Sequence, residues 1–230
     1  MNSWVAPERR SVVPSQAARR FVMLGGDLVE SYALPNAMAA LDAAPRVTLS
    51  VERVDPDFPS RLELGTADVA FVPAAFAPPT LRSFTLPPAR FVVLMRREHP
   101  VAKKKLTLAR YLAFQHVLVA PRGLPGSLVD AALAAQGQSR RVKLTVQHFT
   151  SAPFLLLASD LLLTCPETVA HATAAQLGLR VAALPVALTD DDVRMVWHER
   201  AHRDPGHQWL RGLVVDTVRG AGARRGRVAS

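Results

Sequence analysis

The stretch that decides the fold is Trp197–Arg211, WHERAHRDPGHQWLR. It contains His198–His202, an H-E-x-x-H pattern in which two histidines one helical turn apart bind zinc and the glutamate serves as general base. That chemistry requires a helix. The preceding residues 193–197 (VRMVW) alternate and are branched or bulky, which predicts a strand. Asp204–Pro205 has the form of an N-cap followed by proline at the first helical position, so a new helix is expected to begin there.

The histidines are therefore expected on a strand end and a turn. His207, the third candidate ligand, is also displaced from the spacing that metalloproteases of this type use. These two features favour strand, turn and capped helix over a zinc protease. The acidic run Asp190–Asp192 could attract a divalent cation, but three adjacent carboxylates cannot all face one point, so a solvated connection is favoured. The sequence predicts neither a metal site nor a cofactor.

The composition is that of a globular protein. The chain has 230 residues, of which 49% are hydrophobic and 20% are charged, which is enough for one large domain or two small ones. No apolar run approaches the ~20 residues of a membrane span, and the N-terminus lacks a secretory leader pattern. The single cysteine, Cys165, excludes an internal disulfide and lies in an apolar run. We expect a cytoplasmic protein that does not bind membranes.

The net charge of +9 is concentrated at the two ends. Residues 1–20 carry a net +3 and residues 219–230 a net +4, which leaves +2 for the rest. Both ends have the composition of disordered segments, and we place these at residues 1–19 and 221–230. The cluster Lys103–Lys105 follows a polar turn, where a solvated loop is favoured over a phosphate site. Charge alone does not indicate that this chain binds DNA.

Apolar runs alternate with helical patterns in the first part of the chain. We expect strands at 21–24, 47–51 and 68–72, with helices from about 27 to 44 and at 58–64. This β-α-β-α-β order implies a parallel sheet with right-handed crossovers.

A second α/β unit follows the strand at 90–96. We expect strands at 116–119, 142–146, 161–164 and 181–184, and helices at 124–136, 151–158 and 167–176. A final strand at 193–198 and a helix at 205–219 follow, and this apolar helix must cover one of the two sheets.

In the closing segment, the strand ends in Trp-His-x-Arg (Trp197, His198, Arg200) and is followed by Asp-Pro-x-His-x-Trp-Leu-Arg (Asp204 to Arg211). This resembles the closing motif of the LysR-type transcriptional regulators. Other pieces similar to that family occur in the same order along the chain: Leu62-x-x-Gly65-x-x-Asp68-x-Ala70, His99-Pro100-x-Ala102, Arg122-Gly123 with Asp130, and Ser159-Asp160-Leu161-Leu162. The resemblance covers about residues 20–219 and is greatest to the branch that responds to small aromatic signals such as salicylates and flavonoids.

The resemblance implies an α/β fold of two Rossmann-like lobes joined by two crossing strands, like the type II periplasmic binding proteins. Residues 20–93 and 195–220 would form lobe 1, and residues 97–190 would form lobe 2. It also implies homodimers or higher homo-oligomers. Members of the family begin with a winged helix-turn-helix, whereas only about 20 residues precede the first strand here. DNA contact would therefore require a helix-turn-helix that this chain lacks.

A ligand in such a fold is expected beyond the carboxyl ends of the strands, between the lobes, where helix N-termini offer free N–H groups. A mostly apolar cleft with a few polar groups suits a small aromatic acid. The candidate effector-binding residues are Gly26, Asp27, Phe76, Arg122, His148, Phe149, Thr150, Ser151 and Thr164.

The best candidate is the segment 148–151. Thr150 or Ser151 would cap the next helix, Phe149 would stack on an aromatic ring, and His148 would donate a hydrogen bond. A core phenylalanine beside an internally satisfied histidine is an equally good interpretation.

The other candidates also have structural alternatives. The glycines at 25 and 26 allow close backbone approach or simply a tight turn, and Asp27 is more simply an N-cap. Arg122 could pair with a carboxylate or remain solvated. Phe76, followed by two prolines, would be a lid or a loop anchor.

Three functions can be weighed. The leading hypothesis is a co-inducer-binding domain of a LysR-type regulator, and the alternative is a free-standing cytoplasmic solute-binding or interaction protein of the same fold. An enzyme is not expected, because the sequence has no nucleophile elbow around Ser127 and no phosphate-binding glycine loop.

Overall fold

The computed structural model describes residues 18–32, 34–121, 127–188 and 193–225. The chain divides into two compact units, residues 1–88 with 191–230, and residues 89–190. Residues 1–17 and 226–230, on which the prediction of disordered ends mainly rests, lie outside the described residues.

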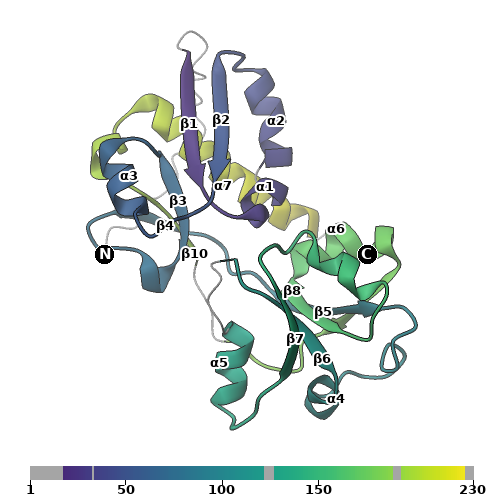
Figure 1. Cartoon of the computed structure of the whole chain (residues 1–230). Coiled ribbons are helices and arrows are strands. Elements are labelled where there is room, and N and C mark those ends of the chain that lie inside the picture. The colour runs from purple at the N-terminus through teal and green to yellow at the C-terminus, as the bar shows by residue number, and fades with distance from the viewer. Residues whose placement is uncertain (1–17, 33, 122–126, 189–192, 226–230) are drawn as a thin grey trace. The chain divides into compact units, whose positions relative to one another are not determined.

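The first unit is built on a mixed sheet with the order β2-β1-β3-β10-β4 (Figure 1). Its strands are β1 (Arg19–Leu24), β2 (Val47–Glu52), β3 (Val69–Pro73), β4 (Arg82–Thr85) and β10 (Val193–Trp197). The pairs β1–β2 and β1–β3 are parallel, as the β-α-β-α-β order predicted. The antiparallel strand β10 lies between β3 and β4, and β4 was not predicted from the sequence.

The helical elements of the first unit are α1 (Asp27–Tyr32), α2 (Leu34–Asp42), α3 (Phe58–Leu64), η1 (Ala74–Phe76), η3 (Glu199–Ala201) and α7 (Pro205–Arg225). The helix expected from 27 to about 44 corresponds to α1 and α2, which lie on either side of residue 33, and the helical residues end at Asp42. Residue 33 itself lies outside the described residues. Helix α3 ends at Gly65, where φ is 78°, as the glycine predicted.

Helix α7 covers the first unit. Leu210, Val214 and Val215 are buried in one cluster with Phe21 and Trp197. The sequence required the last helix to pack on one of the two units, and the structure assigns it to the first.

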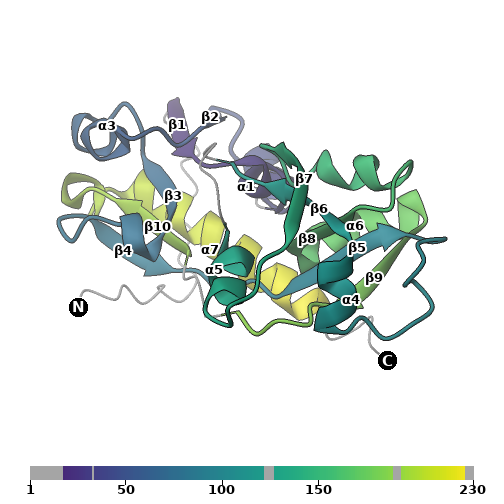
Figure 2. The same ribbon diagram turned by 60° about the horizontal axis from the view of Figure 1, so that its bottom comes forward.

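The second unit has a mixed sheet with the order β7-β6-β8-β5-β9 (Figure 2). Its strands are β5 (Phe91–Arg96), β6 (Gln115–Val119), β7 (Arg141–Val146), β8 (Leu162–Pro166) and β9 (Leu179–Ala183). Strand β6 is parallel to β7 and β8, whereas β5 is antiparallel to β8 and β9. The predicted lobe 1 extended to residue 93, within β5, whereas this strand pairs with the second sheet from Phe91 onward.

The helical elements of the second unit are α4 (Leu108–Ala113), α5 (Leu128–Ala134), η2 (Ala152–Leu156) and α6 (Glu167–Leu177). Helix α4 was not predicted. The helix expected at 151–158 is instead the short 3-10 helix η2, in which Pro153 removes one backbone donor near the start. Helix α5 begins at Leu128, after Ser127 as N-cap, and residues 124–126 of the longer predicted helix lie outside the described residues.

Candidate functional site

The closing segment forms a strand, a turn and a capped helix, as its sequence predicted. Strand β10 ends at Trp197, the turn η3 follows, and the side chain of Asp204 accepts a hydrogen bond from the backbone N–H of His207 at 2.6 Å. Asp204 therefore caps α7 and satisfies one of the free backbone N–H groups at the start of this helix.

The three histidines of this segment bond to different protein groups. Nδ1 of His198 accepts from the N–H of Arg200, and the ring of His202 stacks on Trp197 with centroids 6.1 Å apart. His207 donates from Nε2 to the carbonyl of Asp68 at 2.9 Å. They do not share one helix face, which the zinc-protease geometry requires. Within the described ranges, no three His, Cys, Asp or Glu side chains gather closely enough to hold a metal ion. Asp190–Asp192 lies outside them.

The closing segment contains a buried charged side chain, Arg211. Arg211 is fully buried, its guanidinium lies 4.7 Å above the ring of Trp197, and it donates to the carbonyl of His202 at 2.8 Å. It also contacts Nδ1 of His207. Burial and the nearby Arg211 cation lower the pKa of His207 to about 4, so the ring is neutral at pH 7 and can accept from Arg211.

Motif pieces that are distant in sequence meet in the structure. Arg200 donates from Nε to the carbonyl of Leu62, and His207 bonds to Asp68, so the closing segment holds the Leu62-x-x-Gly65-x-x-Asp68 piece. In the second unit, His99 is buried, and its Nε2 lies 3.2 Å from the carbonyl of Asp160. These motif residues therefore stabilise the two units from within.

The predicted contact residues of the first unit lie at the carboxyl ends of two neighbouring parallel strands. Gly26 and Asp27 follow β1, and Phe76 ends η1 directly after β3. A Cβ on Gly25 would lie 2.7 Å from a methyl group of Val29, so this position needs glycine for close helix packing. Gly26 is exposed, with open space where a Cβ would lie.

Asp27 does not occupy the N-cap position. Helix α1 begins at Asp27, and the carbonyl of the preceding Gly26 accepts from the N–H of Val29 at 2.9 Å. Asp27 is thus the first helical residue, where a carboxylate favours the positive end of the helix. Phe76 is half exposed, at 51%.

The segment 148–151 follows β7 at the carboxyl edge of the second sheet. His148, Thr150 and Ser151 are exposed, and Phe149 is partly buried. Ser151 precedes η2 but makes no side-chain capping hydrogen bond, so the predicted capping role of Ser151 is wrong. The polar side chains of this segment consequently line a sheet edge rather than a helix start.

Thr164 lies apart from that segment. It is buried in β8, and strand β6 separates β8 from β7. Its hydroxyl is 2.8 Å from the hydroxyl of Tyr111, whose pKa is raised by burial. The hydroxyl of Thr164 therefore has a hydrogen-bond partner within the core of the second unit. Arg122 and Gly123 lie outside the described residues.

The sequence analysis missed the ion pair that continues from Tyr111. Arg140 donates to Tyr111 at 3.3 Å and to the carboxylate of Asp130 at 2.7 Å, and the Arg140 side chain is 2% exposed. Burial favours the neutral acid, but the hydrogen bonds from Arg140 and Ser127 outweigh it and lower the pKa of Asp130. A single carboxylate in the apolar run LVDAALA was the signal that a partner was needed.

Comparisons with known proteins agree with this fold and these motifs. The model of the LysR substrate binding domain matches residues 15–219. The chain is 31% identical over 213 residues to the HTH-type transcriptional activator NagR of a Ralstonia species, covering 90% of this chain and 70% of the relative. It is 31% identical over 208 residues to the activator NahR of Pseudomonas putida, covering 88% and 68%.

A solved structure of a regulatory domain is also similar to this chain. The regulatory domain of MexT, a transcriptional activator in Pseudomonas aeruginosa, is 28% identical, with a TM-score of 0.76, over 87% of this chain and 98% of that domain. The chain belongs to the LysR substrate-binding domain family and has the periplasmic-binding-protein-like fold that the closing motif implied. It is the effector-binding domain of a LysR-type transcriptional regulator and is not an enzyme. Regulators of this family bind small-molecule effectors and DNA, and function as oligomers.

Membrane spanning was also assessed on the structure. None of the helices in the described part of the chain combines the length and apolarity of a membrane span.

Proposed function

We propose that this domain senses a small aromatic carboxylate in the bacterial cytoplasm and thereby controls transcription. The observation that carries the proposal is the segment His148–Ser151. It presents an exposed histidine and two hydroxyl side chains beside a partly buried phenylalanine, at the carboxyl edge of a parallel strand. This combination of one aromatic face and several hydrogen-bond donors suits an aromatic ring bearing a carboxylate.

Gly26, Asp27 and Phe76 form the corresponding candidate contacts in the first unit. Gly26 leaves its backbone accessible, and Phe76 supplies a second half-exposed ring. Loops beyond the carboxyl ends of parallel strands are the usual ligand positions of open α/β sheets.

A thermal-shift screen of the purified chain tests the proposal. The panel contains benzoate, salicylate and other aromatic acids, with aliphatic acids of similar size for comparison. A ligand at a hundred times its dissociation constant stabilises the folded state by ~2.7 kcal/mol, which raises the melting temperature by several degrees. A rise restricted to aromatic acids supports the proposal. The proposal is contradicted if only aliphatic acids raise the melting temperature, or if none of the acids raises it.

Variants then test the position of the site. We expect His148→Ala and Thr150→Val each to weaken binding of the best aromatic acid by about tenfold, the effect of one lost hydrogen bond to a charged group. His171→Ala is the matched control, because His171 is an exposed histidine of α6 that is not among the candidate site residues. Unchanged affinity in both test variants would remove this segment from the site.

We also propose that the chain forms a homodimer through the edge strand β7. Among the described strands it pairs with β6 alone, and its Val142 and Leu144 side chains are 41% and 38% exposed. An apolar edge strand of this kind is a template for pairing with a second copy. Sedimentation equilibrium of Leu144→Lys should show a weaker dimer than the parent chain. Leu64→Lys, at a 77% exposed leucine, is the control, and equal dissociation constants for the two variants would contradict the proposal.

A further inference from the structure

A pocket lies entirely within the second unit, over the edge strand β9. It has a volume of about 440 Å³, which is within the range of roughly 300–1,000 Å³ typical of small-ligand sites. The loop 101–107 and the strand β9 with its continuation to Pro185 form its walls. Because β9 and β7 are opposite edges of the second sheet, this pocket is separate from the segment 148–151.

The floor of the pocket is apolar. Met95 of β5 and Val101, Ala102 and Leu106 of the loop are buried, and Leu184 is partly buried. These residues line the pocket while also packing into the core of the second unit. The floor is therefore held in place by the fold.

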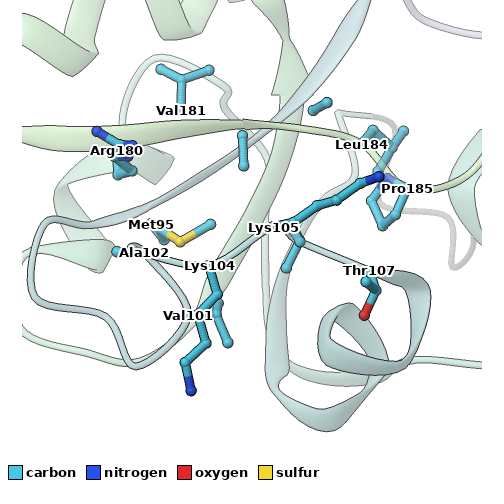
Figure 3. A pocket seen from close by; sticks show the side chains of 13 residues that line it. Met95, Val101, Ala102, Lys104, Lys105, Thr107, Arg180, Val181, Leu184 and Pro185 are labelled. Atoms are coloured by element: carbon cyan, nitrogen blue, oxygen red, sulfur yellow. The ribbon is translucent and has the colours of Figure 1, made fainter.

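The rim of the pocket is cationic. Lys104, Lys105 and Arg180 line it, and all three are exposed. In Figure 3 the side chain of Lys105 extends in the direction of Leu184 and Pro185, and Arg180 lies at the other end of the pocket, beside Val181. No carboxylate lines the pocket, and among the ion pairs of the described residues none involves these three cations.

The loop that carries the two lysines is tied to the fold. Arg110 of α4 donates to the carbonyl of Lys105 at 2.7 Å, and the N–H of Lys104 bonds to the carbonyl of Val101 at 3.0 Å. These bonds fix the backbone of the loop that carries the two lysines at the rim of the pocket.

We propose that this pocket binds a small organic anion with an apolar body, as a second ligand site independent of the one at His148–Ser151. The apolar part lies on Met95, Leu106 and Leu184, and the anionic group meets the cationic rim that Lys104, Lys105 and Arg180 provide.

Fluorescence titration of the full chain with 8-anilino-1-naphthalenesulfonate, an aromatic anion, tests this site. We expect saturable binding that sodium benzoate displaces and that neutral benzamide displaces at least about tenfold less effectively, since benzamide cannot make the charge-assisted contacts. Equal displacement by the two competitors would overturn the proposal.

Two variants locate the site. The double substitution Lys104→Gln with Lys105→Gln should weaken binding of the probe by about tenfold or more. Its control, Lys103→Gln with Lys143→Gln, removes the same charge from exposed lysines that do not line the pocket, and should change affinity less than about twofold in physiological salt. Equal losses would show a net-charge effect only and would overturn the proposal.

Val181→Glu is the second variant. Val181 lines the pocket and is 43% exposed, so a carboxylate there is tolerated by the fold and repels an anion. Val142→Glu, at 41% exposure on β7, is its control. His148→Ala should leave affinity for the probe unchanged. If His148→Ala abolished binding of the probe and the pocket variants did not, the second site would be refuted while the proposed function survived.

Discussion

The closing segment Trp197–Arg211 and the segment His148–Ser151 both follow a strand, yet they differ in what their polar side chains do. In the closing segment, Arg211 and His207 are fully buried and bond to each other and to backbone carbonyls. In the segment 148–151, the polar side chains are exposed at a sheet edge. A motif that suggests metal chemistry can thus have a structural role, whereas the segment that we propose as a ligand contact matches no metal-binding or catalytic motif.

The difference has a physical origin. A buried polar group must find a partner inside the protein, because its loss of water costs free energy. His207 and Arg211 of the closing segment are fully buried, so they bond internally. The polar side chains of the segment 148–151 keep their access to solvent.

The largest expected effect is the removal of Trp197, whose ring is fully buried under Arg211. We expect Trp197→Ala to lower the free energy of unfolding by about 4 kcal/mol, as for other buried aromatic residues. Urea denaturation measures it. Phe154→Ala, at a 57% exposed residue, should lower the free energy far less. Similar losses for the two variants would contradict the contrast between buried and exposed segments.

Acid should destabilise the domain through its buried histidines. Burial, with help from nearby arginines, lowers the pKa of His207 and of His116 to about 4, against about 6.5 in the unfolded chain. The unfolded state therefore binds more protons below pH 6.5, and stability falls as the pH decreases from 6.5 towards 4. Between pH 7.5 and pH 5 each histidine should contribute a loss of about 2 kcal/mol.

The pH dependence of urea unfolding measures this loss. His207→Leu should flatten the dependence between pH 7.5 and 5, although it also destabilises the protein at every pH. His171→Ala, at an exposed histidine, should leave the slope unchanged. An unchanged slope in His207→Leu would show that the pKa of His207 is not lowered.

A smaller loss of stability is expected when the ion pair between Asp130 and Arg140 in the second unit is broken. Asp130→Ala leaves the buried guanidinium of Arg140 without its carboxylate, and we expect a loss of about 2 kcal/mol, less than for a fully buried pair because Asp130 is 28% exposed. Replacing both members, Asp130→Leu with Arg140→Met, should recover part of this loss. A double variant that is less stable than Asp130→Ala would contradict the account of an unpaired buried charge.

The smallest effect is expected at the segment 148–151. His148→Ala should change the free energy of unfolding by less than about 0.5 kcal/mol, because surface substitutions away from special features rarely exceed this value. Urea denaturation without ligand measures this change in the free energy of unfolding. A loss comparable to that of Asp130→Ala would show that His148 supports the fold.

Prediction from the sequence succeeded where the signals were local. The strand before Trp197, the cap at Asp204 and the end of α3 at Gly65 all follow from residues a few positions apart. It failed at Pro153, where helical periodicity received more weight than the missing donor of a proline. It also placed Thr164 in the candidate site, because a strand end was expected two residues earlier than β8 ends.

The sequence by itself determined the order of most strands and helices, the closing motif and hence the family, because periodicity, caps and spacing are properties of neighbouring residues. Only the tertiary structure decided which polar residues are used internally. The partners of Thr164, Asp68 and Leu62 are Tyr111, His207 and Arg200, which are 53, 139 and 138 positions away. The same holds for the pocket at β9, where the lysines of one loop meet the apolar wall of a strand about 75 residues later. Such pairings arise only when the sheets form, because burial then forces each polar group to find a partner.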